Sequence, residues 1–506
     1  MSPEEMGRAD ESAIAAGAPA ELLMRRAGDA VARAAIEVAG GRYGRRAVVV
    51  CGKGSNGGDG FVAARRLARE GLAVTCLTVT DASASSGAAR RHLERLRGTG
   101  VPVLAFESRH LARADVIVDA IFGTGFEGAA RGRAAAAIEA MNDAPAGIVA
   151  VDIPSGVDGL TGGAAGAAVR AAMTVVMAAQ KYGTAVSQGS VLAGRVRVAD
   201  IGITVPDTAV ALTEPADVRR AIPARKPESH KRSGGAVALL AGATGMSGAA
   251  LLAARGAVRM GAGYATLGTT SSVDAAKAIA LPEVLSQVVS DGDALGPASL
   301  TRFDDVLRRA DALALGPGLG RGDDQRNLVI NALDDVDIPI ALDADGLNAL
   351  VKHTKPLERR TGATVITPHP GELARLLNSD IADIQADRLG AAQRAAARLR
   401  CVVVLKGWRT VVANARGRTV VNPTGGAELA TAGTGDVLTG AVAALLAAGL
   451  DPFDAAWAAV FVHGEAGAIA ARSARGGVLA WDVAEALPHA LSALPGERPQ
   501  PADSGP

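Results

Sequence analysis

Hydrophobic and polar positions alternate along the chain in two ways. Short apolar runs with strand character are separated by Ala-, Leu- and Arg-rich stretches in which apolar residues recur at helical spacing. In the first part of the chain the candidate strands are residues 47–51, 73–79, 116–120, 147–152 and 173–177, and the candidate helices are 59–70, 88–97 and 134–142. Strands separated by helices predict βαβ units and a mostly parallel sheet.

The alternation stops between residues 205 and 235. This stretch, VPDTAVALTEPADVRRAIPARKPESHKRSGG, has four prolines, mixed charge and little periodicity, so we expect a domain boundary here. A second alternating series follows, with candidate strands at 236–241, 312–315, 338–342, 363–367, 402–406 and 409–413. We therefore expect two α/β domains, over residues 1–210 and 216–490, and a proline-rich disordered tail over residues 491–506.

The composition narrows the class of protein. Of the 506 residues, 49% are hydrophobic and 21% are charged, which is typical of a soluble globular protein and not of a disordered one. Lys and Arg (53) balance Asp and Glu (52), so a general nucleic-acid or membrane-surface binder is not favoured. The N-terminus lacks a signal-peptide pattern, no apolar run approaches ~18 residues, and the three cysteines show no C-x-x-C spacing. These features predict a cytoplasmic protein with buried, reduced thiols.

The first glycine-rich loop follows the strand at residues 47–51 and reads GKGSNGGDG. Its glycines fit G-x-G-x-x-G, a dinucleotide fingerprint in which backbone N–H groups approach an anionic ligand. Asp81 could serve as the acid that a redox-cofactor site requires, although it is somewhat far along the chain. Asn56 and Asp59, however, place polar groups where a pyrophosphate would pack against bare backbone. A redox cofactor is therefore the less favoured interpretation, and Asp59 could also simply cap the following helix.

Polar residues also follow the next strands, at the sheet edge where parallel sheets bind ligands. Asn56, Asp119 and Ser155 carry hard oxygen ligands that suit an alkali or alkaline-earth cation. Asp152 ends a strand beside a proline turn, a position suited to a general acid or base. Structural roles remain possible, since Asp119 and Asp152 could form turns and the glycine loops could serve packing alone. A fourth strand-end stretch, QKYG at residues 180–183, gives a weaker signal.

The strongest segment of the second domain is ATAGTGDVLTGAVAALLAAG, residues 430–449. Gly-Thr-Gly at a helix N-terminus makes an anion hole from backbone amides. Asp436 lies within it and could accept a proton from a hydroxyl while a phosphoryl group is transferred. A helix-capping aspartate is the structural alternative. GATGMSGAA lacks the G-K-[ST] of a Walker A motif, so P-loop chemistry is not expected.

Other loops after strands of the second domain point to the same cleft. They include ALGPGLG at residues 314–320, His369 between two prolines, and Lys406 at a hairpin-like turn where its cation could meet phosphate. The segment ALDADGLNAL adds Asp343, Asp345 and Asn348, which either face a metal or cap a helix.

Four motifs of the first domain resemble those of a known family. GKGSNGGDGFVAARRL, VDAIFGTGF, VDIPSGVDG and ELLMRRAGDAVA together resemble the NAD(P)H-hydrate epimerase family. The resemblance implies a Rossmann-like α/β/α domain, Asp152 as the catalytic acid/base, and a potassium ion held by Asn56, Asp119 and Ser155. It implies that hydrated NADH or NADPH contacts Asp152 and two segments: Ser55, Asn56, Gly57, Gly58 and Asp59, and Gly123, Thr124, Gly125, Phe126, Glu127, Gly128 and Ala129. Ser55 departs from the asparagine that is usual in the family.

The second domain resembles the ADP-dependent NAD(P)H-hydrate dehydratase family, which has a ribokinase-like α/β fold. ESHKRSGG, GMSGAALLAARGAVRMGAGYAT, GPGLG, TPHPGELARLL, LKG and AGTGDVLTG occur in that order. The resemblance implies Asp436 as the catalytic residue, Mg²⁺ with ADP as the cofactors, and a substrate site that includes Asp436, Ala249, Gly318 and His369. It implies that ADP binds to Lys406, Gly407, Trp408, Arg409, Thr410 and Gly435. Gly426 departs from a position where the family usually has asparagine.

Together the two resemblances imply a bifunctional metabolite-repair enzyme, an isomerase and a lyase in one chain. It would interconvert the R and S forms of hydrated NADH and NADPH and dehydrate the S form at the expense of ADP. Small-molecule substrates and a homo-oligomer are also implied. Two alternatives remain: a ribokinase-like vitamin kinase with a regulatory domain, which would yield a stable phosphorylated product, and a non-catalytic nucleotide sensor.

Overall fold

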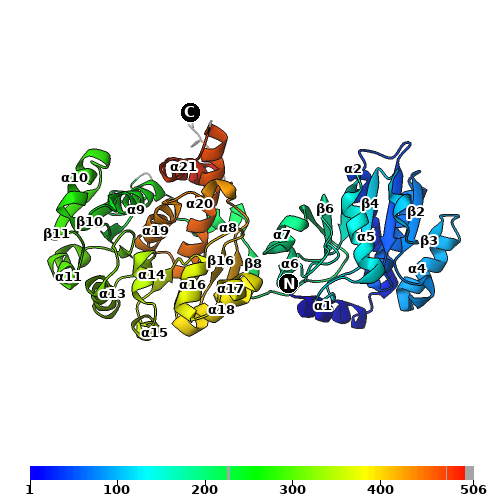
Figure 1. Cartoon of the computed structure of the whole chain (residues 1–506), viewed down its shortest axis with the longest axis horizontal. Coiled ribbons are helices and arrows are strands. Elements are labelled where there is room, and N and C mark those ends of the chain that lie inside the picture. Colours follow the sequence, from blue (N-terminus) through cyan, green and yellow to red (C-terminus); the bar gives the residue numbers. More distant parts are fainter. Residues whose placement is uncertain (225–227, 229, 475, 496–506) are drawn as a thin grey trace, which may run out of the picture. The chain divides into compact units, whose positions relative to one another are not determined.

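The computed structural model describes residues 1–224, 228, 230–474 and 476–495 (Figure 1). Its contacts divide the chain into two compact units, Met1–Thr208 and Ala209–Pro506. The division precedes the expected end of the first domain at residue 210, because β8 (Val210–Leu212) pairs with β17 (Thr419–Val421) in the second sheet. The segment in which we expected the domain boundary, residues 205–235, thus contains an edge strand of the second unit.

The first unit is an alternating series of helices and strands. Its elements are α1 (Pro3–Ala15), α2 (Ala20–Val38), β1 (Arg46–Cys51), α3 (Ser55–Arg69), β2 (Ala73–Thr78), η1 (Ala82–Ala84), α4 (Gly87–Arg97), β3 (Val103–Ala105), η2 (Ser108–Leu111), β4 (Val116–Ala120), α5 (Gly132–Asp143), β5 (Gly147–Val151), β6 (Met173–Met177), α6 (Tyr182–Ala185), α7 (Gly189–Leu192) and β7 (Arg195–Ala199). The strands form one parallel sheet in the order β3-β2-β1-β4-β5-β6-β7.

Helices cover both faces of this sheet, which confirms the Rossmann-like α/β/α architecture. Successive residues of β1 face opposite cores: Val49 packs in the core beneath α2 and α3, whereas Val48 and Val50 pack in the core beneath α5. The strand order reverses between β1 and β4, the switch point at which such sheets bind ligands.

One expected loop of the first unit is helical. We expected a helix from residue 59, but α3 begins at Ser55, so the segment Ser55–Asp59 forms its first turn. Glycine disfavours helices, yet here the backbone must come close to its surroundings: a Cβ on Gly57 would lie 2.0 Å from the carbonyl oxygen of Gly52. Packing against the preceding loop thus overrides local helix propensity.

The second unit is the larger α/β unit. Its elements, besides β8 and β17, are α8 (Pro215–Ala221), β9 (Ala236–Leu240), α9 (Ser247–Met260), β10 (Tyr264–Thr270), α10 (Ser271–Ala280), β11 (Leu285–Ser290), α11 (Pro297–Arg302), α12 (Asp304–Leu307), β12 (Ala312–Leu315), α13 (Asp323–Asp335), β13 (Ile340–Leu342), α14 (Asp345–Ala349), α15 (Lys355–Arg359), β14 (Thr364–Ile366), α16 (Pro370–Leu377), α17 (Ile381–Ala386), α18 (Arg388–Leu399), β15 (Val402–Leu405), β16 (Val411–Ala413), η3 (Ala427–Leu429), α19 (Thr434–Ala447), α20 (Pro452–Ser473) and α21 (Ala480–Ala493).

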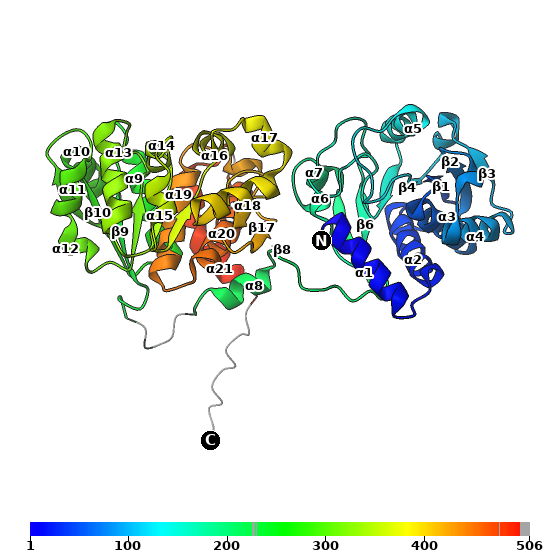
Figure 2. The same cartoon turned by 90° about the horizontal axis from the view of Figure 1, so that it is seen from below.

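Its sheet has the order β11-β10-β9-β12-β13-β14-β15-β16-β17-β8. The pairing is parallel from β11 to β15, and β16 is antiparallel to both of its neighbours. The buried core on one face joins the sheet to α9, α19, α20 and α21, and α13, α15 and α18 lie on the other side (Figures 1 and 2). Lys406 therefore follows β15 at the turn into an antiparallel partner, as its hairpin-like setting predicted.

The C-terminal prediction is partly wrong. Residues 491–493, which we expected in a disordered tail, complete α21, and this helix contains Pro488. It persists because Leu487 and Ala490 are buried in the core of the second unit. Leu494 and Pro495 follow the helix, and residues 496–506 of the predicted tail lie outside the described residues.

Candidate active sites

The first candidate site lies at the carboxyl ends of β1, β4, β5 and β6, and its polar centre is Asp119. This residue is fully buried near the end of β4, where its carboxylate accepts bonds from the Ser155 hydroxyl (2.6 Å), the Ser155 N–H (2.8 Å) and the Ile121 N–H (3.3 Å). Burial raises the pKa of Asp119 to about 6. No ion pair reaches it among the described residues, so a bound cation would supply the missing positive charge.

Hydrogen bonds through Phe122 connect the three residues predicted to hold a cation. The Asn56 amide donates to the carbonyl oxygen of Phe122 at 2.7 Å, and the Phe122 N–H donates to the Ser155 hydroxyl at 2.9 Å. Asn56 comes from α3, Asp119 from β4 and Ser155 from the loop after β5, so three elements meet here. Carboxylate, hydroxyl, amide and carbonyl oxygens fit a hard monovalent or divalent cation.

Asp152 lies directly after β5 with an unusual backbone. Its φ of 65° is in the left-handed region, which costs energy for a residue with a Cβ and persists where the surroundings impose it. Its N–H donates to Val175 of β6 at 2.8 Å, and its Oδ1 accepts from the Met177 N–H at 2.9 Å. The Lys181 ammonium also donates to Oδ1, at 2.5 Å. Sequence reasoning had noted only the weak QKYG stretch that contains this lysine.

Two further carboxyl groups face this pair. Asp59 in the first turn of α3 and Asp10 in α1 both have a raised pKa, first because of burial and partly because of the Asp152 charge. For Asp59 the pKa lies well above the usual range of an aspartate. A protonated carboxyl and a lysine-paired carboxylate together provide an acid and a base. Asp10 gave no signal in the sequence, since α1 joins the site only through tertiary packing.

The second predicted substrate segment, Gly123–Ala129, runs from β4 toward α5 on the partly exposed rim. Phe126 stacks on Phe122, with ring centroids 4.5 Å apart and an interplanar angle of 20°. This pair fixes the segment next to the Asn56 side chain, since a Cβ on Gly123 would lie 3.5 Å from it. Gly123 and the first turn of α3, which belong to the two predicted segments, are therefore neighbours. Ser55, the departing residue, is exposed at the start of α3.

The second candidate site lies at the carboxyl ends of β13, β14 and β15 beside the N-terminus of α19. Asp343 is 1% exposed; its Oδ1 accepts from the Lys406 ammonium at 2.9 Å and its Oδ2 from the Thr439 hydroxyl at 2.7 Å. Lys406 Nζ also lies 4.0 Å from Glu372 Oε2. Of the three residues named for this segment, Asp343 bonds to Lys406 and Thr439, and Asp345 acts on Asp436 through its charge.

Asp436 is in the first turn of α19, next to this pair. Burial, and then the negative charge of Asp343, raise its pKa to about 7, while Lys406 acts in the opposite direction. Gly433 precedes the helix with a φ of 92°, and a Cβ on Gly435 would lie 3.3 Å from Lys406 Nζ. The helix start, the lysine and two carboxylates thus lie together, and the N–H groups at the helix start are suited to bind an anion.

His369 and Glu372 border the same cluster through the cap of α16. The His369 N–H donates to Glu372 Oε2 at 2.8 Å, and the Gly371 N–H donates to His369 Nδ1 at 3.1 Å. The His369 side chain is about half exposed. Its partial burial, and then the Lys406 charge, lower the pKa of His369, so the imidazole is neutral near pH 7. Glu372 is 6% exposed and has a raised pKa because of burial; sequence reasoning had not singled it out.

The remaining predicted substrate residues are neighbours of each other. Gly318, after β12, has a φ of 62°, and a Cβ there would lie 3.0 Å from the Ala249 Cβ in α9. The departing residue of this unit, Gly426, has an extended backbone before η3.

The predicted nucleotide segment, Lys406–Thr410, is the turn between β15 and β16. Its backbone has a positive φ at Gly407 (135°) and at Arg409 (55°). The Arg409 guanidinium lies 5.3 Å from the ring centre of the exposed Trp408. Arg388, 5% exposed, donates to the carbonyl oxygens of Leu405 and Lys406, each at 3.1 Å. A buried guanidinium thus braces the turn.

The side chains of the two sites offer few ligands to a metal ion. Among the described residues, no group of three His, Cys, Asp or Glu side chains is placed to hold a metal ion. A Mg²⁺ ion at the second site would therefore take most of its ligands from phosphate oxygens and water, which is how Mg²⁺ often binds with nucleotides.

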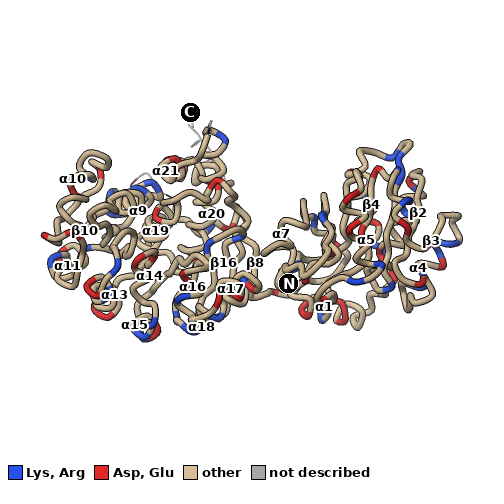
Figure 3. Tube along the Cα trace, in the orientation of Figure 1, with Lys and Arg blue, Asp and Glu red and all other residues tan. Residues whose placement is uncertain are grey.

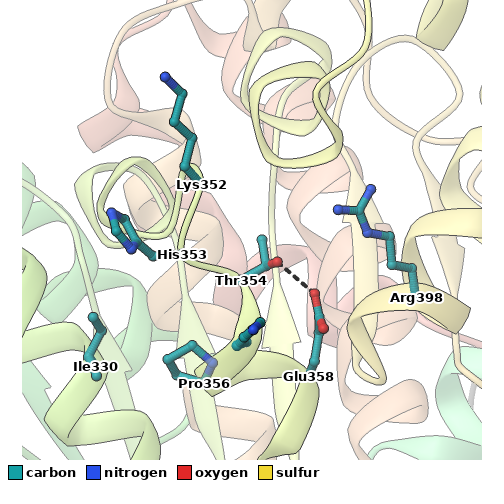
Figure 4. Close-up of a pocket in the computed structure, with 8 residues that line it drawn as sticks. Ile330, Lys352, His353, Thr354, Pro356, Glu358 and Arg398 are labelled. Atoms are coloured by element: carbon teal, nitrogen blue, oxygen red, sulfur yellow. Dashed lines mark hydrogen bonds between the residues drawn. The ribbon is translucent and has the colours of Figure 1, made fainter.

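A separate hollow of about 570 Å³ lies on the second unit, away from these residues (Figure 4). It is lined by Ile330, Lys352, His353, Thr354, Lys355, Pro356, Glu358 and Arg398. The Thr354 hydroxyl is satisfied by Glu358 at 2.6 Å, and no predicted site residue lines the hollow. Volume alone therefore does not identify the chemistry of this unit.

Both kinds of charge are interspersed along the chain, in keeping with its near-zero net charge (Figure 3). In the described part of the chain, none of the helices has the length and apolar character needed to cross a membrane.

Comparison with known proteins gives matches for both units. Residues 20–183 match the family described as "YjeF-related protein N-terminus", and residues 237–489 match the family described as "NAD(P)H-hydrate dehydratase". The bifunctional NAD(P)H-hydrate repair enzyme Nnr of Moorella thermoacetica is 40% identical over 516 aligned positions, which cover 98% of this chain and 97% of that protein.

Two solved structures resemble the second unit. One is an ADP/ATP-dependent NAD(P)H-hydrate dehydratase from Bacillus subtilis, co-crystallized with ATP/Mg²⁺; it is 36% identical, with a TM-score of 0.50, and the match covers 56% of this chain and 99% of that chain. The other is a ribokinase-like superfamily protein from Enterococcus faecalis, 25% identical with a TM-score of 0.50, and the match covers 57% of this chain and 98% of that chain. The ribokinase-like fold expected for the second unit is thereby confirmed.

Proposed function

The chain belongs to the family of bifunctional NAD(P)H-hydrate repair enzymes, and from this we propose that its two units act in turn on hydrated NADH and NADPH. The first unit interconverts the R and S epimers at ring carbon C6, and the second removes water from the S epimer at the expense of ADP. The observation that carries the proposal is that each unit gathers its own acid–base residues at the carboxyl edge of its sheet, in a chain that matches such an enzyme over nearly its full length.

For epimerisation, Asp152 accepts the proton of the C6 hydroxyl group. C6 then becomes a carbonyl as its bond to ring nitrogen N1 breaks, and N1 takes a proton from the Asp59 carboxyl. Rotation about the C5–C6 bond and the reverse steps close the ring as the other epimer. The separate environments of Asp59 and Asp152 suit this division between acid and base.

A potassium ion would be held by Asn56, Asp119 and Ser155, as the hydrogen bonds that connect them through Phe122 support. When bound, it would supply positive charge near the phosphates of the substrate. The segments Ser55–Asp59 and Gly123–Ala129 would bind and orient the dinucleotide, with helix N–H groups of α3 facing its phosphates.

For dehydration, Asp436 accepts the proton of the C6 hydroxyl as the hydroxyl oxygen attacks the terminal phosphoryl group of ADP. AMP leaves, the C6–O bond then breaks to release phosphate, and loss of a C5 proton restores the ring double bond. N–H groups at the start of α19 and the Lys406 ammonium stabilise the transferred group. A pKa of about 7 suits Asp436 to a base at neutral pH.

ADP would lie along Lys406, Gly407, Trp408, Arg409 and Thr410 and reach Gly435. Because Lys406 contacts Asp343 and lies near Glu372, we assign it to the phosphate end of the nucleotide and Trp408 to the base. Mg²⁺ would be held by the phosphates together with Asp343 or Glu372, and would supply charge neutralisation. Ala249, Gly318 and His369 would contact the hydrated dinucleotide.

We also propose a cytoplasmic location and a homo-oligomer. The three cysteines, Cys51, Cys76 and Cys401, are free and buried, which suits a reducing compartment. The homo-oligomer rests on the family resemblance.

Single-site variants test this assignment. The protein is incubated with mixed hydrate epimers and ADP or ATP, and each epimer, AMP and NADH are followed by chromatography. Asp152→Asn should slow epimerisation by at least ~100-fold and spare dehydration of the S epimer, and Asp436→Asn should do the reverse. A stable phosphorylated product would instead favour a vitamin-type kinase, and no turnover in the wild type would favour a sensor.

A further inference from the structure

Lys181 is one of the largest fully buried side chains of the chain, with 0% of its surface exposed. It lies between β6 and α6, and its ammonium donates to Asp152 Oδ1 at 2.5 Å and to the carbonyl oxygen of Met177 at 2.7 Å. A buried ammonium is costly unless it is paired, so this contact is a specific feature of the site rather than a surface ion pair.

The bonds to Asp152 are one-sided. Both the Lys181 ammonium and the Met177 N–H end on Oδ1, which leaves Oδ2 for a substrate proton. Because Met177 also accepts from Lys181, the lysine ties the end of β6 to the carboxylate. The left-handed φ of Asp152 makes such restraints necessary, since an unrestrained aspartate would relax to a commoner conformation.

Charge gives the contact a second role. The titratable groups that act on the pair from packed elements are Asp10 on α1, Asp59 on α3 and the Met1 amino group. Glu5, which accepts from the Tyr182 hydroxyl, acts on that amino group. Burial and the Asp152 charge raise the pKa of both Asp10 and Asp59, and Lys181 acts on both in the opposite direction. Lys181 thus places a positive charge at contact distance from Asp152, among these carboxyl groups.

We propose that Lys181 is a positioning residue of epimerisation, which supplies the counter-charge of Asp152 and directs its Oδ2 to the C6 hydroxyl of the substrate. This inference rests on the proposed function of Asp152. Lys181 itself does not touch the reacting atoms; it acts through the carboxylate that it holds.

The test is the pH profile of epimerisation in the full chain, measured from pH 5 to pH 9. Lys181→Met removes the charge and the donor, whereas Lys181→Gln keeps a donor without the charge. Both should lower the rate at pH 7 by at least ~10-fold, and both should move the acidic limb of the profile upward by about one pH unit or more. Loss of packing alone would lower the rate without moving that limb.

Controls separate the possible failures. Arg170→Met, at an exposed position of the same unit, should keep the wild-type profile. An acidic limb that stays in place in Lys181→Gln, or a first unit that unfolds in both lysine variants, would overturn the proposal. Asp152→Asn, measured in parallel, tests the premise: if it still epimerises at the wild-type rate, the proposed role of Asp152 fails, whatever the lysine variants show.

Discussion

Lys406 and Asp343 act on Asp436 in opposite directions, although the two residues are bonded to each other. The ammonium stabilises the ionised form of Asp436, and the Asp343 carboxylate destabilises it. The base of the second site is therefore set by a balance of neighbours rather than by burial alone. The same residues must also receive the nucleotide, so catalysis and nucleotide binding share one set of charges.

This balance predicts a pair of opposite pH shifts. Dehydration should rise with pH through about 7 in the wild type, because Asp436 must lose its proton to act as a base. Lys406→Met should move this midpoint to higher pH and Asp343→Asn to lower pH, each by about one unit. The measurement is kcat/KM for the S epimer against pH at saturating ADP. Lys352→Met, at an exposed lysine of the same unit, should leave the midpoint in place; shifts of one sign in both variants would contradict the balance.

The cation site gives a prediction that does not depend on turnover. Asp119 is fully buried without an ion pair among the described residues, so K⁺ should bind there and raise the melting temperature of the first unit. Asp119→Asn should remove most of this increase. Thermal unfolding in KCl and in choline chloride of equal ionic strength measures it, and Asp115→Asn, at a surface aspartate, serves as the matched control. A K⁺ effect of wild-type size in Asp119→Asn would place the ion elsewhere.

At the scale of elements, two helices hold the second site together through glycines. A Cβ on Gly440 of α19 would lie 1.9 Å from the Ala253 carbonyl oxygen of α9, and one on Gly256 of α9 would lie 2.3 Å from the Val437 carbonyl oxygen. The helices approach closely only because side chains are absent at both positions. The position of the N-terminus of α19, which includes Asp436, is therefore set by this packing of Gly440 about one turn further along the helix.

Gly440→Ala should separate these helices. Overpacking should destabilise the second unit by about 1–3 kcal/mol and slow dehydration, while epimerisation is unaffected. Gly248→Ala, on α9 itself, is the matched control: a Cβ there meets nothing within 4 Å, and alanine should be neutral or stabilising. Melting of the full chain and both activities are measured together. Equal behaviour of the two variants would rule out the close approach as the cause.

Strands and helices with a clear hydrophobic pattern could be predicted from the sequence. Because parallel sheets bind ligands at the carboxyl ends of their strands, most polar residues of the two candidate sites could then be located as well. β4, β6 and β12 have the expected limits, since each is a buried apolar run. The predicted ends of elements were wrong where contacts between residues far apart in the chain determine them. α3 begins within the glycine loop because Gly57 packs on Gly52, and α21 runs through Pro488 because its apolar face is buried. β8 is short and pairs with a strand some two hundred positions later, so no local pattern marks it.

The site residues that the sequence did not identify share the same cause. Glu372 and Thr439 lie within motifs that were recognised, but only the fold brings them to Asp343 and Lys406. Asp10 and Arg388 lie on helices that gave no chemical signal and enter the sites by tertiary packing. The contribution of a buried charge depends on its partners, which are distant in the chain.

At the scale of the whole molecule, each unit carries its acid–base residues within its own fold. No residue of one cluster belongs to the other unit. The substrate of the second reaction can therefore come from any epimerase domain in solution, provided that it is released.

Complementation tests this independence. Neither Asp152→Asn nor Asp436→Asn alone should convert the R epimer to NADH at the wild-type rate. An equimolar mixture of the two variants should restore conversion after a lag, as the S epimer diffuses from one chain to the other. Mixing each variant with itself at the same total concentration is the control. Conversion no faster than in either variant alone would mean that the epimer is not released between the reactions.

The left-handed backbone of Asp152 limits which residues can replace it and Lys181 in related sequences. Glycine at this position would relieve the conformational cost, but it would leave the Lys181 ammonium buried without its counter-charge, which is strongly destabilising. Neither residue can be lost alone at low cost, whereas loss of both is tolerable once epimerisation is no longer selected. Across related sequences, positions 152 and 181 should therefore change together. A lineage with glycine at the first and an apolar residue at the second has kept the fold and given up the reaction.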